Sequence, residues 1–177
     1  MSKEIEKKYL IRENGVDFFS DSLAEIFPKI SELEEEVIEK GKKIRQGYLS
    51  LEDGEALAKE VGMNIDFNPV EARLRDKAGK YFLTVKGDGS LTRNEEEKSL
   101  DQKVFQNYWS LTEGRRVEKV RLEKSYQGFT AEFDVYIDRD LIVAEIEVPS
   151  EQDANNLVPL GKDITSDKSY KNKNLAK

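Results

Sequence analysis

Apolar and polar residues alternate along most of this chain, in short runs separated by turn-forming residues. Successive side chains of a β-strand point to opposite faces, so this alternation predicts strands with one apolar and one polar face. The predicted strands are Glu4–Ile11, Lys42–Ser50, Val70–Asp76, Lys80–Lys86, Leu91–Ser99, Arg115–Lys124, Phe129–Ile137 and Leu141–Val148. Several of the gaps are only long enough for tight turns, which favours antiparallel neighbours.

Helices are predicted in the longer gaps. Capping-box spacing, in which Ser or Thr is followed three residues later by Glu or Gln, is found at Ser22-x-x-Glu25, Ser31-x-x-Glu34 and Ser99-x-x-Gln102. Pro28 separates the first two helices and Gly41 ends the second. The segments Glu52–Val61 and Ser169–Ala176 are also predicted to be helical. Strands and helices together predict an α+β fold in which antiparallel strands predominate.

The length of 177 residues, without an internal repeat or a linker rich in Pro, Gly or Ser, predicts a single domain over residues 1–177. The net charge of −7 argues against a nucleic-acid partner. No apolar run approaches the roughly 20 residues of a membrane span, and the first residues, MSKEIEKK, lack the apolar region of a signal peptide. We therefore expect a cytoplasmic protein with no membrane partner.

The chain contains no histidine and no cysteine. Ser-His-Asp and Cys-His catalysis, imidazole or thiolate metal sites and disulfides are thereby excluded. Carboxylates without imidazole or thiolate ligands beside them favour hard cations such as Mg²⁺ or Mn²⁺.

The polar faces of the predicted strands are ionic rather than merely polar. Fifteen charged side chains share these faces: Glu4, Glu6, Lys8, Arg73, Arg75, Lys86, Arg93, Glu95, Glu97, Lys119, Arg121, Glu132, Asp134, Glu145 and Glu147. For any single strand, the ordinary interpretation is a sheet that turns its charges to water. However, pairs such as Arg73 and Arg75 place like charges side by side, which is unfavourable unless opposite charges lie between them. We therefore expect the ionic faces to converge inside an eight-stranded antiparallel closed β-barrel, with a polar lumen and helices packed outside.

Such a lumen suits a metal–polyphosphate ligand. Arginine offers bidentate hydrogen bonds to phosphate oxygens. Mg²⁺ is usually held by carboxylates together with substrate phosphates and water. Because phosphoryl transfer depends chiefly on positioning and charge stabilisation, it does not require histidine.

The chain also resembles a known family. The resemblance begins with the ExExK motif Glu4-Ile5-Glu6-Lys7-Lys8 and continues in order through seven further blocks and a closing segment. These are Ile44–Leu49, Glu71–Arg75, Phe82–Gly87, Arg93–Glu97, Lys119–Arg121, Glu132–Tyr136, Ala144–Val148 and Asp163–Ala176. In the order and sequence of these blocks, the chain is similar to the CYTH, or triphosphate tunnel metalloenzyme, superfamily. This superfamily includes class IV adenylate cyclases and thiamine triphosphatases.

The resemblance implies an eight-stranded tunnel and divalent-metal-dependent hydrolysis of a small-molecule triphosphate. It implies metal ligands at Glu4, Glu6, Asp134, Glu145 and Glu147. It implies a triphosphate cradle of Lys8, Arg73, Arg75, Lys86, Arg93, Lys119 and Arg121, joined by Lys168 from the closing segment. Glu4, Glu6 and Lys8 are the candidate catalytic residues, and Glu95, Glu97 and Glu132 are supporting residues that order the basic side chains or help to hold a second metal.

Two features depart from the family pattern. Residues 51–69 form a longer connection than in compact members, which we interpret as a surface excursion rather than a lid. Ser169 stands where the family often has arginine, so a basic contact there depends on Lys168.

The leading hypothesis is a metal-dependent inorganic triphosphatase, acting as a monomer or homodimer. Thiamine triphosphatase and class IV adenylate cyclase are alternatives, but each needs an apolar or stacking wall beside the tunnel. Trp109 lies on a helix expected to pack outside, so it does not supply that wall. A non-catalytic polyphosphate-binding module is the alternative from another class. The general base is left open between a carboxylate-bound water and Lys8.

Overall fold

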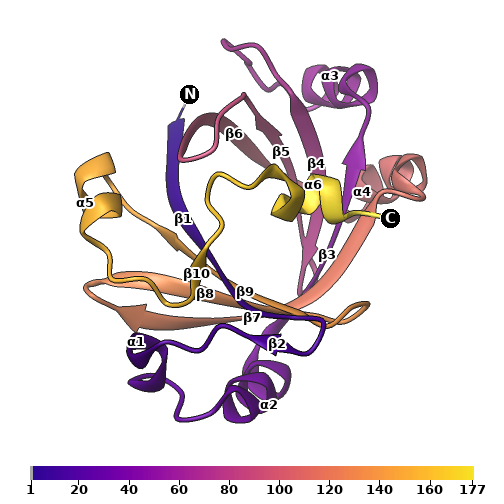
Figure 1. Ribbon diagram of the computed structural model, residues 1–177. Coiled ribbons are helices and arrows are strands. Elements are labelled where there is room, and N and C mark those ends of the chain that lie inside the picture. Colours follow the sequence, from indigo (N-terminus) through magenta and orange to yellow (C-terminus); the bar gives the residue numbers. More distant parts are fainter. Residues whose placement is uncertain (1) are drawn as a thin grey trace. The chain divides into compact units, whose positions relative to one another are not determined.

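The computed structural model describes residues 2–177 (Figure 1). It contains eight long strands: β1 (Ser2–Glu13), β3 (Lys42–Leu49), β4 (Glu71–Lys77), β5 (Lys80–Lys86), β6 (Thr92–Leu100), β7 (Arg116–Tyr126), β8 (Phe129–Tyr136) and β9 (Leu141–Glu147). Two short strands, β2 (Val16–Asp17) and β10 (Lys162–Asp163), pair with β1. All the predicted strands are confirmed, with ends that differ by two residues or fewer.

The long strands follow a closed pairing order. It runs β1-β6-β5-β4-β3-β7-β8-β9, and β1 pairs in turn with β9. The registered pairs are antiparallel, as in β4 with β5 and β8 with β9. The predicted α+β class and eight-stranded antiparallel closed β-barrel are confirmed by this order.

The described residues also form six α-helices and two 3₁₀ turns. They are α1 (Asp21–Ala24), α2 (Ile30–Lys40), α3 (Leu51–Glu60), α4 (Gln102–Trp109), η1 (Ser110–Thr112), α5 (Glu151–Asn156), η2 (Lys168–Tyr170) and α6 (Asn172–Leu175). The helix predicted over 52–61 is confirmed as α3, while the predicted C-terminal helix is divided into η2 and α6. No helix among the described residues combines the length and apolar character needed to cross a membrane.

The three capping-box predictions were wrong. Ser20, not Ser22, caps α1, because the Ser20 hydroxyl accepts from the Leu23 N–H and donates to the Leu160 carbonyl at 2.8 Å, a contact far away in sequence. Helix α2 begins after Lys29 without a side-chain cap.

At the third site, Ser99 belongs to β6 and α4 begins after Asp101. Strand pairing therefore outweighed the local capping signal there. A fourth helix start was missed at Ser150, whose hydroxyl accepts from the Asp153 N–H at the start of α5. The spacing Ser150-x-x-Asp153 was the available signal.

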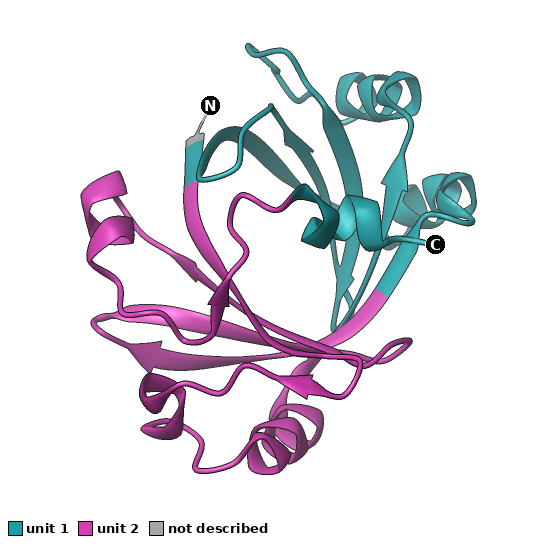
Figure 2. Cartoon of the chain, viewed as in Figure 1, with its two compact units in different colours: residues 1–4, 44–117, 168–177 teal, residues 5–43, 118–167 magenta. Residues whose placement is uncertain are grey.

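The described residues divide into two compact units (Figure 2). Unit 1 comprises the residues up to Glu4, Ile44–Val117 and Lys168–Lys177; unit 2 comprises Ile5–Lys43 and Glu118–Asp167. The single domain over residues 1–177 stays a prediction.

In unit 1, α3 packs against β4 and α4 against β5. Leu57 of α3, Leu74 of β4, Leu83 of β5 and Phe105 of α4 share one buried cluster. The apolar residues of β4 and β5 thus face helices, which leaves their ionic residues on the other face.

In unit 2, α2 packs against β8. Phe27, which precedes α2, meets Phe133 of β8 edge to face at 5.2 Å between ring centroids. As in unit 1, the alternate residues of β8 are charged. Each unit therefore presents one ionic face, and the two faces are described separately below.

Candidate functional site

Strand register aligns the ionic residues of unit 1 in rows across β4, β5 and β6. One row is Glu71, Lys86 and Glu95, and the next is Arg73, Thr84 and Glu97. Thr84 donates to Glu97 at 2.8 Å. We call this set, with Glu4, Arg75 and Arg93, the unit 1 ionic cluster.

Glu4 and Glu95 form the acidic part of this cluster, and Lys86 lies close to both. The Lys86 ammonium donates to both Glu4 oxygens, at 2.9 and 3.2 Å, and lies 3.8 Å from a Glu95 oxygen. Burial, together with the hydrogen bond that the protonated Glu95 donates to the Glu4 carboxylate and the negative charge of Glu4, raises the pKa of Glu95 to about 8. Glu4 and Glu95 thus bring hard oxygen ligands close together, with both Glu4 oxygens accepting from the Lys86 ammonium.

Arg73 and Arg93 carry unsatisfied donors. Arg73 is 6% exposed, and its one hydrogen bond within residues 2–177 is a long one, 3.4 Å from Nη2 to the Thr84 hydroxyl. Arg93 Nη2 donates to Glu71 at 3.2 Å. The Nε atoms of both arginines are buried without a hydrogen-bond partner among the described residues. A buried guanidinium with vacant donors favours an anion with several acceptor oxygens.

Glu71 lies between these two arginines. Its burial acts to raise its pKa, but Arg93 and Arg73 outweigh that effect and hold the pKa below its ordinary value. Glu71 therefore stays ionised, and its negative charge holds the two arginines on this face.

The closing segment brings another cation to unit 1. The Lys171 ammonium donates to the Gly89 carbonyl at 2.9 Å. Burial and the charge of Arg93 lower the pKa of Lys171. Sequence reasoning selected Lys168, which is exposed, and missed Lys171; its position within the family-like closing segment was the available signal.

Unit 2 contains a tighter ionic cluster built around Arg121. Its guanidinium donates two hydrogen bonds to Asp134, at 2.6 and 2.8 Å, and one to Glu132 at 2.8 Å. Lys119 lies 2.7 Å from Asp134, and both side chains are fully buried. Burial would raise the pKa of Asp134, but Arg121 and Lys119 outweigh it and hold the pKa well below its ordinary value.

Glu145 and Lys8 complete this unit 2 ionic cluster. They are partners in the register of β1 and β9, with 3.6 Å between the ammonium and a carboxylate oxygen. Burial acts to raise the pKa of Glu145, whereas Lys8 and Arg121 together lower it to about 2. Asp134 and Glu145 therefore stay ionised near neutral pH.

The five predicted metal ligands are distributed over both units. Glu4 belongs to unit 1, whereas Glu6, Asp134, Glu145 and Glu147 belong to unit 2, where Glu6 and Glu147 are register partners and Glu147 is exposed. Among residues 2–177, no three carboxylates converge into a preformed metal site. The ligand assignment therefore stays a prediction.

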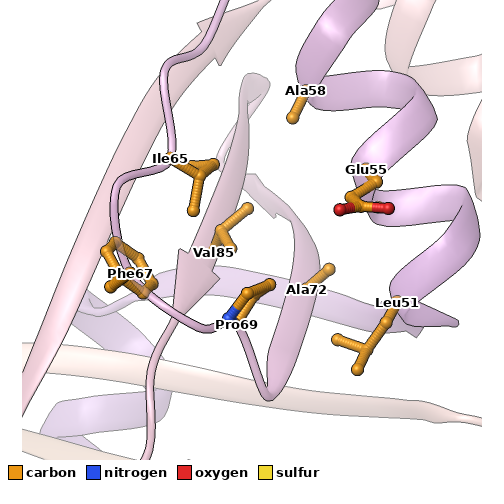
Figure 3. Close-up of a pocket in the computed structure, with 9 residues that line it drawn as sticks. Leu51, Glu55, Ala58, Ile65, Phe67, Pro69, Ala72 and Val85 are labelled. Atoms are coloured by element: carbon orange, nitrogen blue, oxygen red, sulfur yellow. The ribbon is translucent and has the colours of Figure 1, made fainter.

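An apolar pocket lies beside α3 on the helix-covered face of unit 1 (Figure 3). Helix α3 and the segment that contains Phe67 and Pro69 border it, with Ala72 and Val85 among its lining residues. Since Ala72 and Val85 alternate with Arg73 and Lys86 along their strands, the pocket and the ionic cluster lie on opposite faces. The pocket is therefore not an apolar wall for a base or thiamine group bound at that cluster.

Comparison with known proteins places the chain in a family. No protein-family model matches it. The chain is 37% identical over 139 residues to the inorganic triphosphatase of Nitrosomonas europaea, an alignment that covers 75% of this chain and 83% of the relative. The chain belongs to the CYTH, or triphosphate tunnel metalloenzyme, superfamily.

Solved structures agree with this membership of the CYTH superfamily. A crystal structure of an inorganic triphosphatase matches with a TM-score of 0.56 and 30% identity, over 99% of this chain and 95% of the other. The fold is also that of a candidate adenylate cyclase from Bacillus halodurans, at a TM-score of 0.52 and 19% identity, over 96% and 100% of the two chains.

Proposed function

We propose that this protein is a metal-dependent triphosphatase that hydrolyses a phosphoanhydride bond of inorganic tripolyphosphate. The observation that carries the proposal is the pair of buried Nε donors of Arg73 and Arg93, each of which lacks a protein acceptor among the described residues. A polyanion rich in oxygen atoms supplies such acceptors. The homologous protein from Nitrosomonas europaea, named as an inorganic triphosphatase, supports the same activity.

The proposed substrate-binding residues are the basic members of both clusters. They are Lys8, Arg73, Arg75, Lys86, Arg93, Lys119 and Arg121, together with Lys168. Their role is to neutralise the triphosphate and to orient the scissile bond for attack by water. Glu95, Glu97 and Glu132 are proposed to hold the basic side chains in place, as the Glu97–Thr84–Arg73 and Glu132–Arg121 contacts suggest.

The proposed metal ligands are Glu4, Glu6, Asp134, Glu145 and Glu147, and the proposed metal is Mg²⁺ or Mn²⁺. Superfamily membership suggests a divalent metal, and a chain without histidine or cysteine can offer it only oxygen and amine donors. A bound divalent cation would neutralise phosphate charge and acidify water. Glu4, Glu6 and Lys8 are our candidate catalytic residues.

Three other functions are compared with this proposal. Adenylate cyclase and thiamine triphosphatase activities both need a site for an aromatic group beside the phosphates, and the apolar pocket of unit 1 faces away from its ionic cluster. A non-catalytic polyphosphate-binding module would use the same cations without turnover. A cytoplasmic location and a monomeric or homodimeric state stay predictions.

A substrate panel tests the proposal. Tripolyphosphate, ATP and thiamine triphosphate are each incubated with Mg²⁺ or Mn²⁺, and phosphate, pyrophosphate and cyclic AMP are measured. We expect phosphate release to be fastest from tripolyphosphate. Cyclic AMP from ATP would identify a cyclase, preference for thiamine triphosphate would identify that substrate, and binding without turnover would identify a binding module.

A further inference from the structure

The apolar pocket of unit 1 is built by a part of the chain that the ionic cluster does not use. Residues 51–69, the connection that is longer than in compact members of the family, supply α3 and an extended segment that follows it. The helix and the segment border the pocket from opposite sides, beside Ala72 of β4 and Val85 of β5 (Figure 3). The pocket is therefore a product of this connection, and all its lining residues belong to unit 1.

Small side chains leave the space between α3 and the sheet open. A Cβ atom at Gly54 would collide with the Ala72 methyl group, so the backbone of α3 approaches β4 closely at that point. One helical turn further on, Ala58 is buried on the same side of α3 and carries only a methyl group. Since Gly54, Ala58 and Ala72 all line the pocket, it lacks the long side chains that would fill it.

The extended segment alternates apolar and polar side chains. Ile65, Phe67 and Pro69 line the pocket, whereas the two polar residues between them are exposed. The backbone of residues 64–69 makes no hydrogen bond to another backbone group within residues 2–177. This wall of the pocket is therefore held in place by its apolar side chains, and it can adjust to an occupant without loss of strand pairing.

Among the described residues, Glu55 is the one charged side chain in the pocket lining. It stands four residues after Leu51 on α3, so both lie on one face of the helix, and its carboxylate is turned toward the pocket (Figure 3). Glu55 is exposed, and its carboxylate makes no hydrogen bond or ion pair to the part of the chain that the structure describes. The pocket thus combines an apolar lining with a single free negative charge on its solvent side.

This combination selects the chemistry of an occupant. Glu55 would repel a phosphate or a carboxylate. A purely apolar molecule would cover the Glu55 carboxylate without pairing it, which is unfavourable. A small apolar molecule that carries an ammonium group meets both conditions, because its apolar body fills the pocket while its cation lies against Glu55.

We propose that this pocket is a binding site for a small primary amine with a compact apolar body, whose ammonium group pairs with Glu55. The site lies on the opposite face of β4 and β5 from the unit 1 ionic cluster, because Ala72 and Val85 alternate with Arg73 and Lys86. An amine in the pocket and an anion at the cluster therefore do not compete. The inference does not rest on the proposed function.

The test follows amide shifts by NMR while 2-phenylethylamine, as its ammonium ion, is titrated into the ¹⁵N-labelled chain at about 0.15 M salt. We expect shifts at Gly54 and Ala58, and a Kd about fivefold weaker for the neutral isostere 2-phenylethanol, as for loss of one exposed ion pair. Glu55→Gln should weaken amine binding about fivefold and leave alcohol binding within about twofold. Glu52→Gln is the matched control, since Glu52 is exposed on α3 but does not line the pocket, and it should leave both Kd values within about twofold.

Four results would overturn the inference. They are pocket amides that do not shift at about 10 mM amine, equal binding of the amine and the alcohol, equal losses in Glu55→Gln and Glu52→Gln, and displacement of the amine by tripolyphosphate in EDTA. Shifts of the same amides when the ligand-free protein is concentrated would assign the pocket to a second copy of the chain, and would overturn it as well. Thermal melts of the ligand-free variants exclude unfolding as the cause of any loss.

Discussion

Replacing Arg73 with methionine should weaken triphosphate binding without destabilising the ligand-free protein. Methionine retains most of the aliphatic length and removes the guanidinium. Within residues 2–177, Arg73 makes no ion pair and a single hydrogen bond, at 3.4 Å, and its Nε is buried without a partner. Little native bonding is therefore lost, and a desolvated charge is removed.

The expected magnitudes follow from these contacts. Loss of a weak hydrogen bond and relief of a buried charge largely offset each other, so the free energy of unfolding should change by less than about 1 kcal/mol. Charge-assisted hydrogen bonds to phosphate contribute about 1.5–3 kcal/mol, which corresponds to a Kd weakened by roughly 10- to 100-fold. The opposite balance, with stability lost and binding kept, is expected of a surface ion pair.

Thermal melts with and without tripolyphosphate separate the two outcomes. A ligand at 100 times its Kd adds about 2.7 kcal/mol, which raises Tm by roughly 5–10 °C in a chain of this size. A Kd weakened about 30-fold leaves about 0.9 kcal/mol, a rise of roughly 2–4 °C.

Arg45→Met is the control, because Arg45 lies on the other face of β3, half exposed, with Asp76 at 2.9 Å and Trp109 beneath it. It should lower the Tm of the ligand-free protein slightly and keep the full ligand-induced rise. An equal ligand-induced rise in wild type, Arg73→Met and Arg45→Met would refute the reasoning.

Three further predictions concern the carboxylates. Glu4→Gln and Glu6→Gln should each raise the Mg²⁺ concentration needed for half-maximal phosphate release, because a neutral amide is a weaker ligand than a carboxylate; unchanged metal titrations would contradict the assignment. The pKa of Glu145 is lowered to about 2, so its contribution to folding is present above its unfolded pKa and is lost as pH falls toward 2; an acid titration of Tm should show a steeper loss below about pH 4.5 in wild type than in Glu145→Gln. The pKa of Glu95 is raised to about 8, so its contribution is present below its unfolded pKa and is lost as pH rises through 8; in EDTA, Glu95→Gln should flatten the decline in wild-type Tm between about pH 5 and 9, and parallel curves would count against it.

The strands and their ionic faces could be predicted because alternation is a local property of the sequence. All the long strands were found from period-two patterns, and the charged residues of β4, β7 and β8 do share one face in each unit. The helix-cap predictions failed where a contact distant in sequence selected the capping residue. Ser20 caps α1 because Leu160 accepts its hydroxyl hydrogen, and nothing near Ser20 in sequence shows that carbonyl.

The partners within each cluster could not be predicted, because they depend on register. Charge alone did not show that Arg121 would donate two hydrogen bonds to Asp134, or that Lys86 would form ion pairs with both Glu4 and Glu95.

The most direct test of the central claim is ³¹P NMR of tripolyphosphate mixed with the wild-type protein, with Mg²⁺ and then with excess EDTA. With Mg²⁺, each tripolyphosphate should give one phosphate and one pyrophosphate, and EDTA should stop the reaction. Tripolyphosphate that persists unchanged with both Mg²⁺ and Mn²⁺, or that is cleaved at an equal rate in EDTA, would contradict a metal-dependent triphosphatase.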